Sequence, residues 1–473
     1  MKMFKYVACA VFSLFALSAA EAGEKKKMDK LSADMIVAGS YVVTMDEKQP
    51  LIENGAVAVK NGEIIYVGSK DDVFAKYTAA EMIDGEGKAL MPGFVNGHTH
   101  SSMVLFRGMA DDLELMTWLQ KYIFPMEGRY VDPELIEAGT SLACYEMIQS
   151  GTTSFVDMYF YPDVIADVVD RCGMRAIISA PMIDFPSPGF KGWDDSYAAG
   201  VEYVKRWKEK AHPRIKPALA PHAPYTVSKE HLEVAFKTAQ ELDVPVSIHV
   251  AEDQAETKTI GDKYGKSSIQ LLSEIGMLDQ HTIAAHVVWP TEEDIKTVAG
   301  KSFGAIHNPT SNMKTGAGVA PVPALLEAGV HVGLGTDGAA SNNDLDMWEE
   351  MRLAALIHKG VATNPTVVPA YEALKMATRG GAIAAGMEET GALIPGLKAD
   401  MIQISLDSPR LTPLYDIMSQ LVYAANSSDV VTSIVEGKVL MKDRTILTLD
   451  ETKIKADVEK IASKIRADLK AQK

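Results

Sequence analysis

The stretch Pro92-Gly93-Phe94-Val95-Asn96-Gly97-His98-Thr99-His100 decides how the rest of the chain is interpreted. Apolar residues on both sides of Pro92-Gly93 predict one short buried strand, which two histidines close. Because side chains alternate along a strand, His98 and His100 are expected to project to the same side. At the mouth of a barrel they would form half of a metal site. A surface turn explains a lone His-x-His about equally well, so the rest of the chain must decide.

The composition is that of an ordinary globular protein, with 47% apolar and 23% charged residues. A length of 473 residues suits a large barrel with an appended domain. The formal net charge of −16 argues against nucleic acid or an anionic membrane surface as a partner. It does not exclude a small-molecule substrate, which responds to the local field of its pocket.

Residues 1–22 have the pattern of an export signal peptide. Lys2 and Lys5 give the segment a basic start. An apolar core follows that is too short to span a bilayer, and it ends in small residues typical of a signal-peptidase cleavage site. We therefore expect an exported protein, periplasmic or secreted, with no membrane association in its mature form. Cys144 and Cys172 remain after cleavage, and their apolar, helix-like surroundings predict buried free thiols.

Residues 29–92 and 391–473 are expected to build one small β-sandwich domain from both chain ends. Alternating apolar runs flank Asn61-Gly62, the strongest short hairpin signal, and similar strand patterns return near the C-terminus. Apolar residues at helical spacing then predict a terminal amphipathic helix: Ile454, Val458, Ile461, Ile465 and Leu469.

Residues 93–390 alternate short apolar strands with helical patterns, which is typical of βα units and a parallel sheet. The strand before His98 is followed by seven more: Thr153–Val156, Arg175–Ile178, Ile215–Leu219, Pro245–Ile248, Thr282–Ala285, Ser302–Ile306 and Val330–Leu334. Eight such units over roughly 300 residues predict an α/β fold of the (β/α)8 TIM-barrel type.

Polar residues follow six of these eight strands, at the barrel end where TIM-barrel chemistry takes place. In chain order they are His98 and His100, His222, His249 and Glu252, His286, Asn308, and Asp337. Any one of them could be structural, but six strands that end in this way indicate an active site.

Three neutral imidazoles and one carboxylate suit a single divalent metal ion with a position left for water: His98, His100, His249 and Asp337. Zinc is the first choice, although these ligand types also suit iron or manganese. Such an ion lowers the pKa of its bound water to about 7. Glu252 is placed to carry a proton from that water to a substrate, and His286 to hold or polarise the hydroxide. No lysine follows the fourth strand to bridge a second ion, so we expect one per subunit.

Six motifs together resemble those of the amidohydrolase superfamily: Gly97–His100, His222–Tyr225, His249–Glu252, His286, His307–Asn312 and Gly335–Gly338. Within it the chain looks most like the 5-methylthioadenosine/S-adenosylhomocysteine deaminases, whose relatives include triazine hydrolases and guanine deaminase. The resemblance runs from about Ala33 to the C-terminal region. It implies the ligand set given above, Glu252 and His286 as the proton-handling pair, and a homo-oligomer.

The resemblance also implies four substrate-binding residues. Glu127, in Phe124-Pro125-Met126-Glu127, matches a carboxylate that binds ribose hydroxyls. Trp118, His222 and Ser341 match positions that line the adenine and ribose pocket. The structural alternatives are a solvated helix-start glutamate, a core tryptophan, a satisfied loop histidine and a helix cap.

One segment departs from the pattern of these deaminases. Some relatives bind the homocysteine carboxylate with arginines after the third strand, where this chain has only Ser179–Asp184. Arg175, early in the strand, and Lys191, in the following loop, are the alternatives for this role, but both are expected to be surface charges. Methylthioadenosine therefore fits better than S-adenosylhomocysteine, with Met103 and Phe106 as candidates for an apolar wall around a methylthio group.

The sequence thus predicts a metal-dependent aminohydrolase that converts 5′-methylthioadenosine, S-adenosylhomocysteine or adenosine to the inosine-type product and ammonia. One alternative is an amidohydrolase that acts on another ring, such as an s-triazine or guanine, for which Glu127 would have no role. The other is a catalytically silent exported protein that binds a metal or a nucleoside. Glu252 and His286 argue against it, because binding alone needs no proton carrier.

Overall fold

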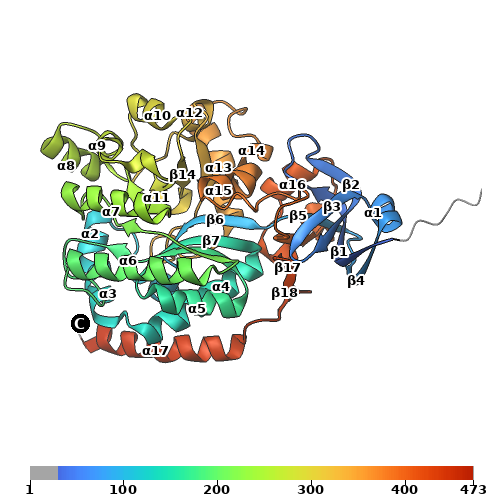
Figure 1. The fold of residues 1–473 in the computed structure, drawn as a ribbon, viewed down its shortest axis with the longest axis horizontal. Coiled ribbons are helices and arrows are strands. Elements are labelled where there is room, and N and C mark those ends of the chain that lie inside the picture. The colour runs from blue at the N-terminus through green and yellow to red at the C-terminus, as the bar shows by residue number, and fades with distance from the viewer. Residues whose placement is uncertain (1–29, 472–473) are drawn as a thin grey trace, which may run out of the picture.

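A computed structural model describes residues 30–471, a barrel with a smaller β-sheet unit beside it (Figure 1). The predicted signal peptide, residues 1–22, lies outside the described residues. Within residues 30–471, no helix has both the length and the apolar character needed to cross a membrane.

Eight parallel strands form the barrel, and each overlaps a strand predicted from the sequence. They are β6 (Phe94–Thr99), β7 (Thr152–Met158), β8 (Arg175–Ser179), β10 (Ile215–Pro217), β12 (Val246–Val250), β13 (Thr282–His286), β14 (Phe303–His307) and β15 (His331–Leu334). Leu219 bridges to Val246 and so joins the two halves of the barrel. On the other side, the Asp337 N–H donates to the His98 carbonyl oxygen at 3.0 Å. Two short paired strands, β9 (Pro181–Met182) and β11 (Ala220–Pro221), follow β8 and β10.

The strand predicted before His98 is in fact two strands. β5 (Lys88–Pro92) pairs in the smaller sheet, and β6 starts the barrel directly after Gly93. A Cβ at Gly93 would lie 2.1 Å from the side chain of Thr153, so only glycine fits where the chain passes from one sheet to the other. Apolar residues lie on both sides of Gly93, so the sequence pattern predicted one strand where the structure has two.

Helices surround the barrel (Figure 1). They are α4 (Pro133–Ser150), α5 (Pro162–Cys172), α6 (Trp193–Lys210), α7 (Lys229–Leu242), α8 (Gln254–Tyr264), α9 (Ser268–Glu274), α10 (Glu292–Val298), α11 (Pro309–Lys314), α12 (Val322–Glu327), α13 (Met347–Ala362), α14 (Ala370–Ala377) and α16 (Ile417–Tyr423). A further helical segment follows β6 and comprises α2 (Leu115–Trp118), the π-helical turn η2 (Leu119–Ile123) and α3 (Phe124–Tyr130). Cys144 and Cys172, on α4 and α5, are buried free thiols as predicted.

Helix α15 (Arg379–Ala384) packs against the inward-facing residues of the barrel strands. Its Ala382 and Ala384 share a core with Val95, Val156, Ile177, Ile283 and Ile306. A Cβ at Gly304 would lie 1.9 Å from the Ala384 carbonyl oxygen, so β14 approaches the helix too closely for any side chain there. These core residues precede the polar residues along their strands, so α15 fills the N-terminal end of the barrel.

The smaller unit is a nine-stranded sheet built from both chain ends. Its strands are β1 (Leu31–Val43), β2 (Leu51–Lys60), β3 (Glu63–Ser69), β4 (Tyr77–Ile83), β5, β16 (Met401–Ser405), β17 (Val430–Val435), β18 (Lys438–Lys442) and β19 (Thr445–Ile446). Antiparallel pairing of β5 with β16 joins the two ends. Val57 and Ile64 from the N-terminal strands share a core with Met401 and Ile434 from the C-terminal strands. Helix α1 (Lys70–Lys76) also packs on this unit. The predicted fold class is thereby confirmed.

The predicted terminal helix is present as α17 (Glu451–Ala471) and lies along the barrel beside α4 (Figure 1). Ile465 on its inner side is 3% exposed. Ion pairs join Arg129 to Asp468 at 3.0 Å and Lys460 to Glu134 at 2.7 Å. The end of the chain therefore packs on the barrel, away from the sheet that precedes it.

Arg175 is buried, so the prediction of a surface charge was wrong. Its Nε and Nη2 atoms donate to the two carboxylate oxygens of Asp400, at 2.7 and 3.3 Å. The Glu436 N–H also donates to Asp400, at 2.7 Å. Arg175 belongs to the barrel and Asp400 directly precedes β16, so a buried ion pair links the two units. Lys191 is exposed, as predicted.

Candidate active site

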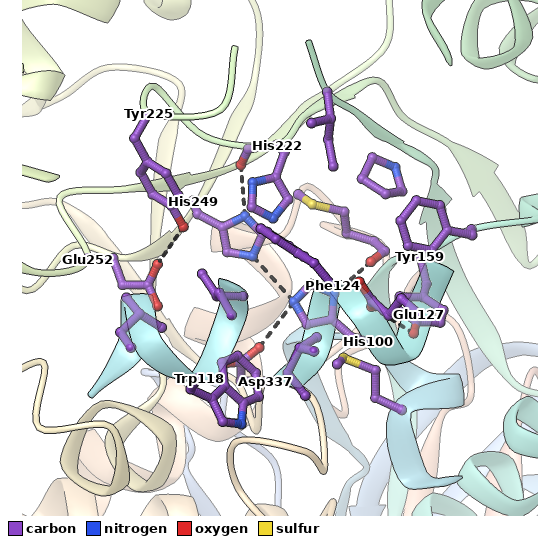
Figure 2. Close-up of a pocket in the computed structure, with 18 of the residues that line it drawn as sticks. His100, Trp118, Phe124, Glu127, Tyr159, His222, Tyr225, His249, Glu252 and Asp337 are labelled. Carbon is purple, nitrogen blue, oxygen red and sulfur yellow. Dashed lines mark hydrogen bonds and ion pairs between the residues drawn. The ribbon is translucent and has the colours of Figure 1, made fainter. Parts of the chain in front are cut away.

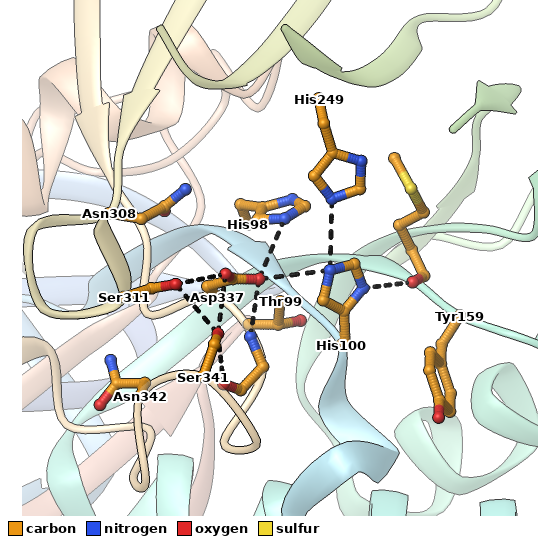
Figure 3. A network of polar contacts seen from close by, with 12 residues as sticks. His98, Thr99, His100, Tyr159, His249, Asn308, Ser311, Asp337, Ser341 and Asn342 are labelled. Carbon is orange, nitrogen blue, oxygen red and sulfur yellow. Dashed lines mark hydrogen bonds and ion pairs between the residues drawn. The ribbon is translucent and has the colours of Figure 1, made fainter. Parts of the chain in front are cut away.

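The four predicted metal ligands meet at the C-terminal end of the barrel strands (Figure 3). The Oδ1 atom of Asp337 lies 3.4 Å from Nε2 of His98 and 3.2 Å from Nε2 of His100. Nε2 of His249 lies 3.3 Å from Nε2 of His100. Donor atoms of His98, His100 and Asp337 all lie within 4.8 Å of one another. The same is true of a second group, which consists of His98, His249 and His286.

Hydrogen bonds on their outer sides orient these ligands. Nδ1 of His100 donates to the Met158 carbonyl oxygen at 2.6 Å, and Nδ1 of His249 donates to the His222 carbonyl oxygen at 2.7 Å. Both bonds leave Nε2 facing the centre, as in metal-binding histidines. Oδ2 of Asp337 accepts the hydroxyls of Ser311 and Ser341, at 2.7 and 2.9 Å. Only Oδ1 therefore faces the imidazoles.

The charges of this cluster suit a cation. Burial lowers the pKa of His98 to about 4. Burial also lowers the pKa of His100, but its contact with the Asp337 carboxylate outweighs that effect and raises it to about 9. Burial alone would raise the pKa of Asp337, yet His100 and His98 hold it well below its usual range. Without an ion, the proton on His100 thus supplies the positive charge beside the Asp337 carboxylate, and a bound metal ion would displace that proton and take over its charge.

His98 gives an independent test of whether a metal fits. The residue is fully buried, Nδ1 has no hydrogen-bond partner among the described residues, and Nε2 has only Asp337 Oδ1 nearby, at 3.4 Å, without hydrogen-bond geometry. Buried polar atoms are rarely left unpaired, because their desolvation is then uncompensated. Coordination of an ion by Nε2 would satisfy that atom, and three imidazoles with one carboxylate are a suitable set for zinc.

Glu252 and His286 lie together beside the metal-binding cluster. Oε1 of Glu252 is 3.6 Å from Nε2 of His286, whose Nδ1 is 2.8 Å from Oδ1 of Asn312. Burial raises the pKa of Glu252 to about 7, so the group can both accept and release a proton near neutrality. His286 and Asp337 have φ values of 75° and 60°, a left-handed backbone that non-glycine residues adopt mostly at constrained sites.

The backbone at Glu252 is held by Glu256, a buried carboxylate on α8. Glu256 accepts the N–H groups of Ala251 and Glu252, at 2.8 and 2.9 Å, and the hydroxyl of Ser268. Burial raises the pKa of Glu256 as well. Glu256 was not predicted from the sequence. The only sequence feature that could have indicated its role is its position in the first turn of α8, the helix that follows β12.

A cavity adjoins the cluster (Figure 2). Its polar lining includes Glu127, His222 and Tyr225, together with His100, His249, Glu252, His286 and Asp337. Apolar side chains make up the rest, among them Met103, Leu115, Trp118, Ile123, Phe124 and Met158. In Figure 2, Glu252 and Glu127 lie on opposite sides of the view, with His100 and His249 between them. A small molecule bound there could contact both carboxylates.

The amidohydrolase family matches residues 89–440, which covers the barrel and most of the C-terminal strands. The chain belongs to the amidohydrolase family. The resemblance predicted from the sequence is therefore confirmed.

Two relatives match this amidohydrolase over nearly their whole length. A 5′-deoxyadenosine deaminase of Methanosarcina mazei is 45% identical over 435 residues, 92% of this chain and 99% of the relative. A 5-methylthioadenosine/S-adenosylhomocysteine deaminase of Pelotomaculum thermopropionicum is 44% identical over 433 residues, again 92% and 99%.

Two solved structures share the fold of this amidohydrolase. An adenosine deaminase from Xanthomonas campestris with bound zinc is 37% identical, with a TM-score of 0.90, and the match covers 93% of this chain and all of that one. The atrazine chlorohydrolase of Arthrobacter aurescens with zinc is 24% identical, with a TM-score of 0.82 over 90% of this chain and all of that one. The second likeness shows the fold alone.

Three of the four predicted substrate-binding residues of this amidohydrolase line the cavity: Trp118, Glu127 and His222. Oε1 of Glu127 accepts the Tyr159 hydroxyl at 2.8 Å, and burial raises the pKa of Glu127 to about 7. Burial and the neighbouring His100 lower the pKa of His222 to about 3, so its ring is neutral.

Ser341 is placed differently from these three. Its hydroxyl donates to Asp337, and the residue is not part of the cavity lining. Phe106 likewise lies in the core, whereas Met103 lines the cavity. Among the described residues, no lysine or arginine lines the cavity.

Proposed function

We propose that this amidohydrolase deaminates an adenosine-type nucleoside to the inosine-type product and ammonia. The observation that carries the proposal is a single cavity with a metal-binding cluster, a proton carrier (Glu252) and a second buried carboxylate (Glu127). Relatives named as 5′-deoxyadenosine deaminase and 5-methylthioadenosine/S-adenosylhomocysteine deaminase support it, as does the expected enzyme class, a hydrolase of C–N bonds in cyclic amidines.

His98, His100, His249 and Asp337 would hold one divalent metal ion per subunit. Zinc is our choice, because the donor set suits it and the adenosine deaminase of similar fold contains it. When bound, such an ion makes water acidic enough to act as a nucleophile near neutral pH.

Glu252 and His286 move and position protons in this proposal. With a pKa of about 7, Glu252 accepts one proton from the attacking water and passes it to the ring nitrogen next to the amino-bearing carbon. It then takes the second proton of the same oxygen and passes it to the amine, which leaves as ammonia when the C–N bond breaks. The ring must accept charge at that nitrogen, which is why a C=N bond beside the amino group is needed. His286 Nε2 faces Glu252 and hydrogen-bonds the attacking oxygen.

Glu127 binds the sugar in this proposal. Its carboxylate is buried and, apart from Tyr159, has no hydrogen-bond partner among the described residues. Two vicinal ribose hydroxyls would donate to it, and hydrogen bonds to a charged acceptor are stronger than neutral ones. A bare triazine or guanine ring has no such hydroxyls, so Glu127 favours a nucleoside over those rings.

The cavity favours an uncharged 5′ substituent on that nucleoside. Met103, Leu115 and Met158 offer apolar contacts, and no described lysine or arginine is available to bind a carboxylate. We therefore propose 5′-methylthioadenosine and 5′-deoxyadenosine as better substrates than S-adenosylhomocysteine, whose charged end would lose hydration without gaining a partner.

Ammonia release tests the function. Zinc-loaded protein is incubated with 5′-methylthioadenosine, 5′-deoxyadenosine, S-adenosylhomocysteine, adenosine, guanine and an aminotriazine, with Glu252→Gln as the control. We expect rapid deamination of the first two, loss of activity with a chelator, and at least a hundredfold lower rate in the variant. Turnover of guanine or the triazine with none of any nucleoside would contradict the assignment. Zinc binding without any turnover would favour the silent binding protein.

We also propose, from residues 1–22 alone, that the protein is exported. Cell fractionation with an antibody against the folded chain tests this proposal. Recovery of the full-length, uncleaved chain in the cytosol would contradict it. A homo-oligomer remains a prediction from the resemblance, for which light scattering is the direct measurement.

A further inference from the structure

Glu350 is a buried carboxylate outside the cavity that no part of the proposed reaction uses. It lies on α13 and is 0% exposed. No described cation contributes to its environment, and burial raises its pKa to about 8. An uncompensated buried carboxylate destabilises a fold, so Glu350 depends on the hydrogen bonds that its neighbours donate.

Glu350 contacts the two segments that hold the metal ligand Asp337. Its Oε2 accepts the Thr310 N–H at 3.2 Å, and its Oε1 accepts the Asn342 side-chain amide at 2.7 Å. Thr310 directly precedes Ser311, and Asn342 directly follows Ser341. The same Asn342 amide also donates to the Thr336 carbonyl oxygen, at 2.8 Å, one residue before Asp337.

Ser311 and Ser341 are the residues that orient Asp337. Both hydroxyls donate to Oδ2, and the two oxygens lie 2.9 Å from each other (Figure 3). With Oδ2 occupied, Oδ1 alone faces His98 and His100. The direction of the carboxylate thus depends on the separation of two serines that come from different segments of the chain.

We infer that Glu350 is a positioning residue for the metal centre, which fixes Ser311 and Ser341 so that Asp337 presents a single oxygen to the ion. The inference rests on the metal-binding role proposed above for Asp337. Outer hydrogen-bond partners of metal ligands typically change metal affinity by about 10-fold to 100-fold when removed. Glu350 acts one contact further out, so the lower end of that range is expected.

Zinc affinity of Glu350→Gln, measured by competition with a chromophoric chelator, tests the inference. The comparison is made at pH 9, where Glu350 is ionised and both of its oxygens accept. The amide of the variant can accept a hydrogen bond from Thr310 or from Asn342, but its NH2 group opposes the other donor. We expect the Kd for zinc to rise about 10-fold. At saturating zinc KM should be unchanged, because Glu350 does not reach the cavity.

Asp294→Asn is the matched control. Asp294 is also a buried carboxylate, 1% exposed, but it joins α9 to α10 by accepting from Ser267 and Thr291. This variant should lose thermal stability while it binds zinc as tightly as the unchanged protein. Equal zinc affinity in Glu350→Gln and the unchanged protein, or an equal loss in both variants, would overturn the inference.

Asn342→Ala keeps the test decisive if Glu350→Gln does not fold. It removes the link from Glu350 to the Ser341 segment and leaves the Thr310 link in place, so a several-fold weaker zinc affinity is expected. Unchanged affinity in this variant would also overturn the inference. Failure of the unchanged protein to bind zinc would instead overturn the proposed function, so the two failures are distinguishable.

Discussion

Glu127 shows how the burial of one side chain sets its chemistry. Burial raises the pKa of Glu127 to about 7, although the Tyr159 hydrogen bond opposes that change. The carboxylate is therefore ionised above pH 7 and protonated below it. Only the ionised form accepts two hydroxyl hydrogen bonds at full strength.

Nucleoside binding should accordingly tighten as the pH rises through about 7. The measurement is the Kd of 5′-deoxyadenosine between pH 5.5 and 8.5, made in the Glu252→Gln background so that no turnover or Glu252 titration interferes. Glu127→Gln should weaken binding roughly 10-fold or more, since hydrogen bonds to charged groups contribute about 1.5–3 kcal/mol, and should abolish the pH dependence.

Tyr159→Phe is the control for this pH dependence. It removes the hydrogen bond that lowers the pKa of Glu127, so the transition should move to higher pH. The Kd is compared in the Glu252→Gln background alone, with Glu127→Gln added and with Tyr159→Phe added. If the Kd changes at the same pH in all three proteins, a group other than Glu127 controls binding.

Glu256→Gln should separate catalysis from binding. The amide cannot accept both the Ala251 and the Glu252 N–H groups, so the backbone at Glu252 loses a hydrogen bond to a charged acceptor. We expect kcat to fall about 10-fold, equivalent to about 1.4 kcal/mol, with KM little changed. Asp262→Asn, on the exposed side of the same helix, should leave kcat unchanged. A rise in KM alone would contradict this role for Glu256.

At the scale of elements, close packing between β14 and α15 gives a sharp prediction. Gly304→Ala should destabilise the protein by about 1–3 kcal/mol or prevent folding, because the new methyl group would meet the Ala384 carbonyl. Gly261→Ala, on α8, has nothing within 4 Å of its added Cβ and should keep or slightly raise Tm. Thermal unfolding of both variants is the measurement, and equal Tm values would contradict the tight contact.

The strands, and the polar residues that meet at their C-terminal ends, were predictable from the sequence because both depend on local pattern. A run such as Thr282–Ala285 has strand propensity by itself, and His286 follows it directly. The helical segment from Leu115 to Tyr130 was not predicted, although Trp118 and Glu127 on it were chosen from the resemblance. Its π-helical turn and Pro125 interrupt the regular spacing on which such a prediction depends.

Contacts between residues far apart in sequence were not predictable. Arg175 and Asp400 are 225 positions apart, and no local pattern distinguishes a buried arginine at the start of a strand from an exposed one. Ser341 was expected in the substrate pocket but contacts Asp337 instead. Glu256 and Glu350 occupy ordinary helix positions in the sequence. Only the hydrogen bonds in the structure show that they fix the Ala251–Glu252 backbone and the segments around Asp337.

At the scale of the whole molecule, the Arg175–Asp400 pair links the barrel to the sheet. Arg175→Met would leave a buried carboxylate without its cation and should destabilise the protein by about 3–5 kcal/mol. The double variant with Asp400→Asn should recover part of that loss, because the amide oxygen still accepts the Glu436 N–H. Thermal unfolding with zinc saturating is the measurement. A double variant no more stable than Arg175→Met would contradict this account.

The pairing of β5 with β16 has a consequence for synthesis on the ribosome. About 300 residues separate the two strands, which at typical translation rates corresponds to a delay of roughly 15–60 s. During that time β5 has one edge without a partner, and such edges promote aggregation. Only a chain translated past Ser405 can cover this edge of β5, so nascent chains that stop earlier should be selectively degraded.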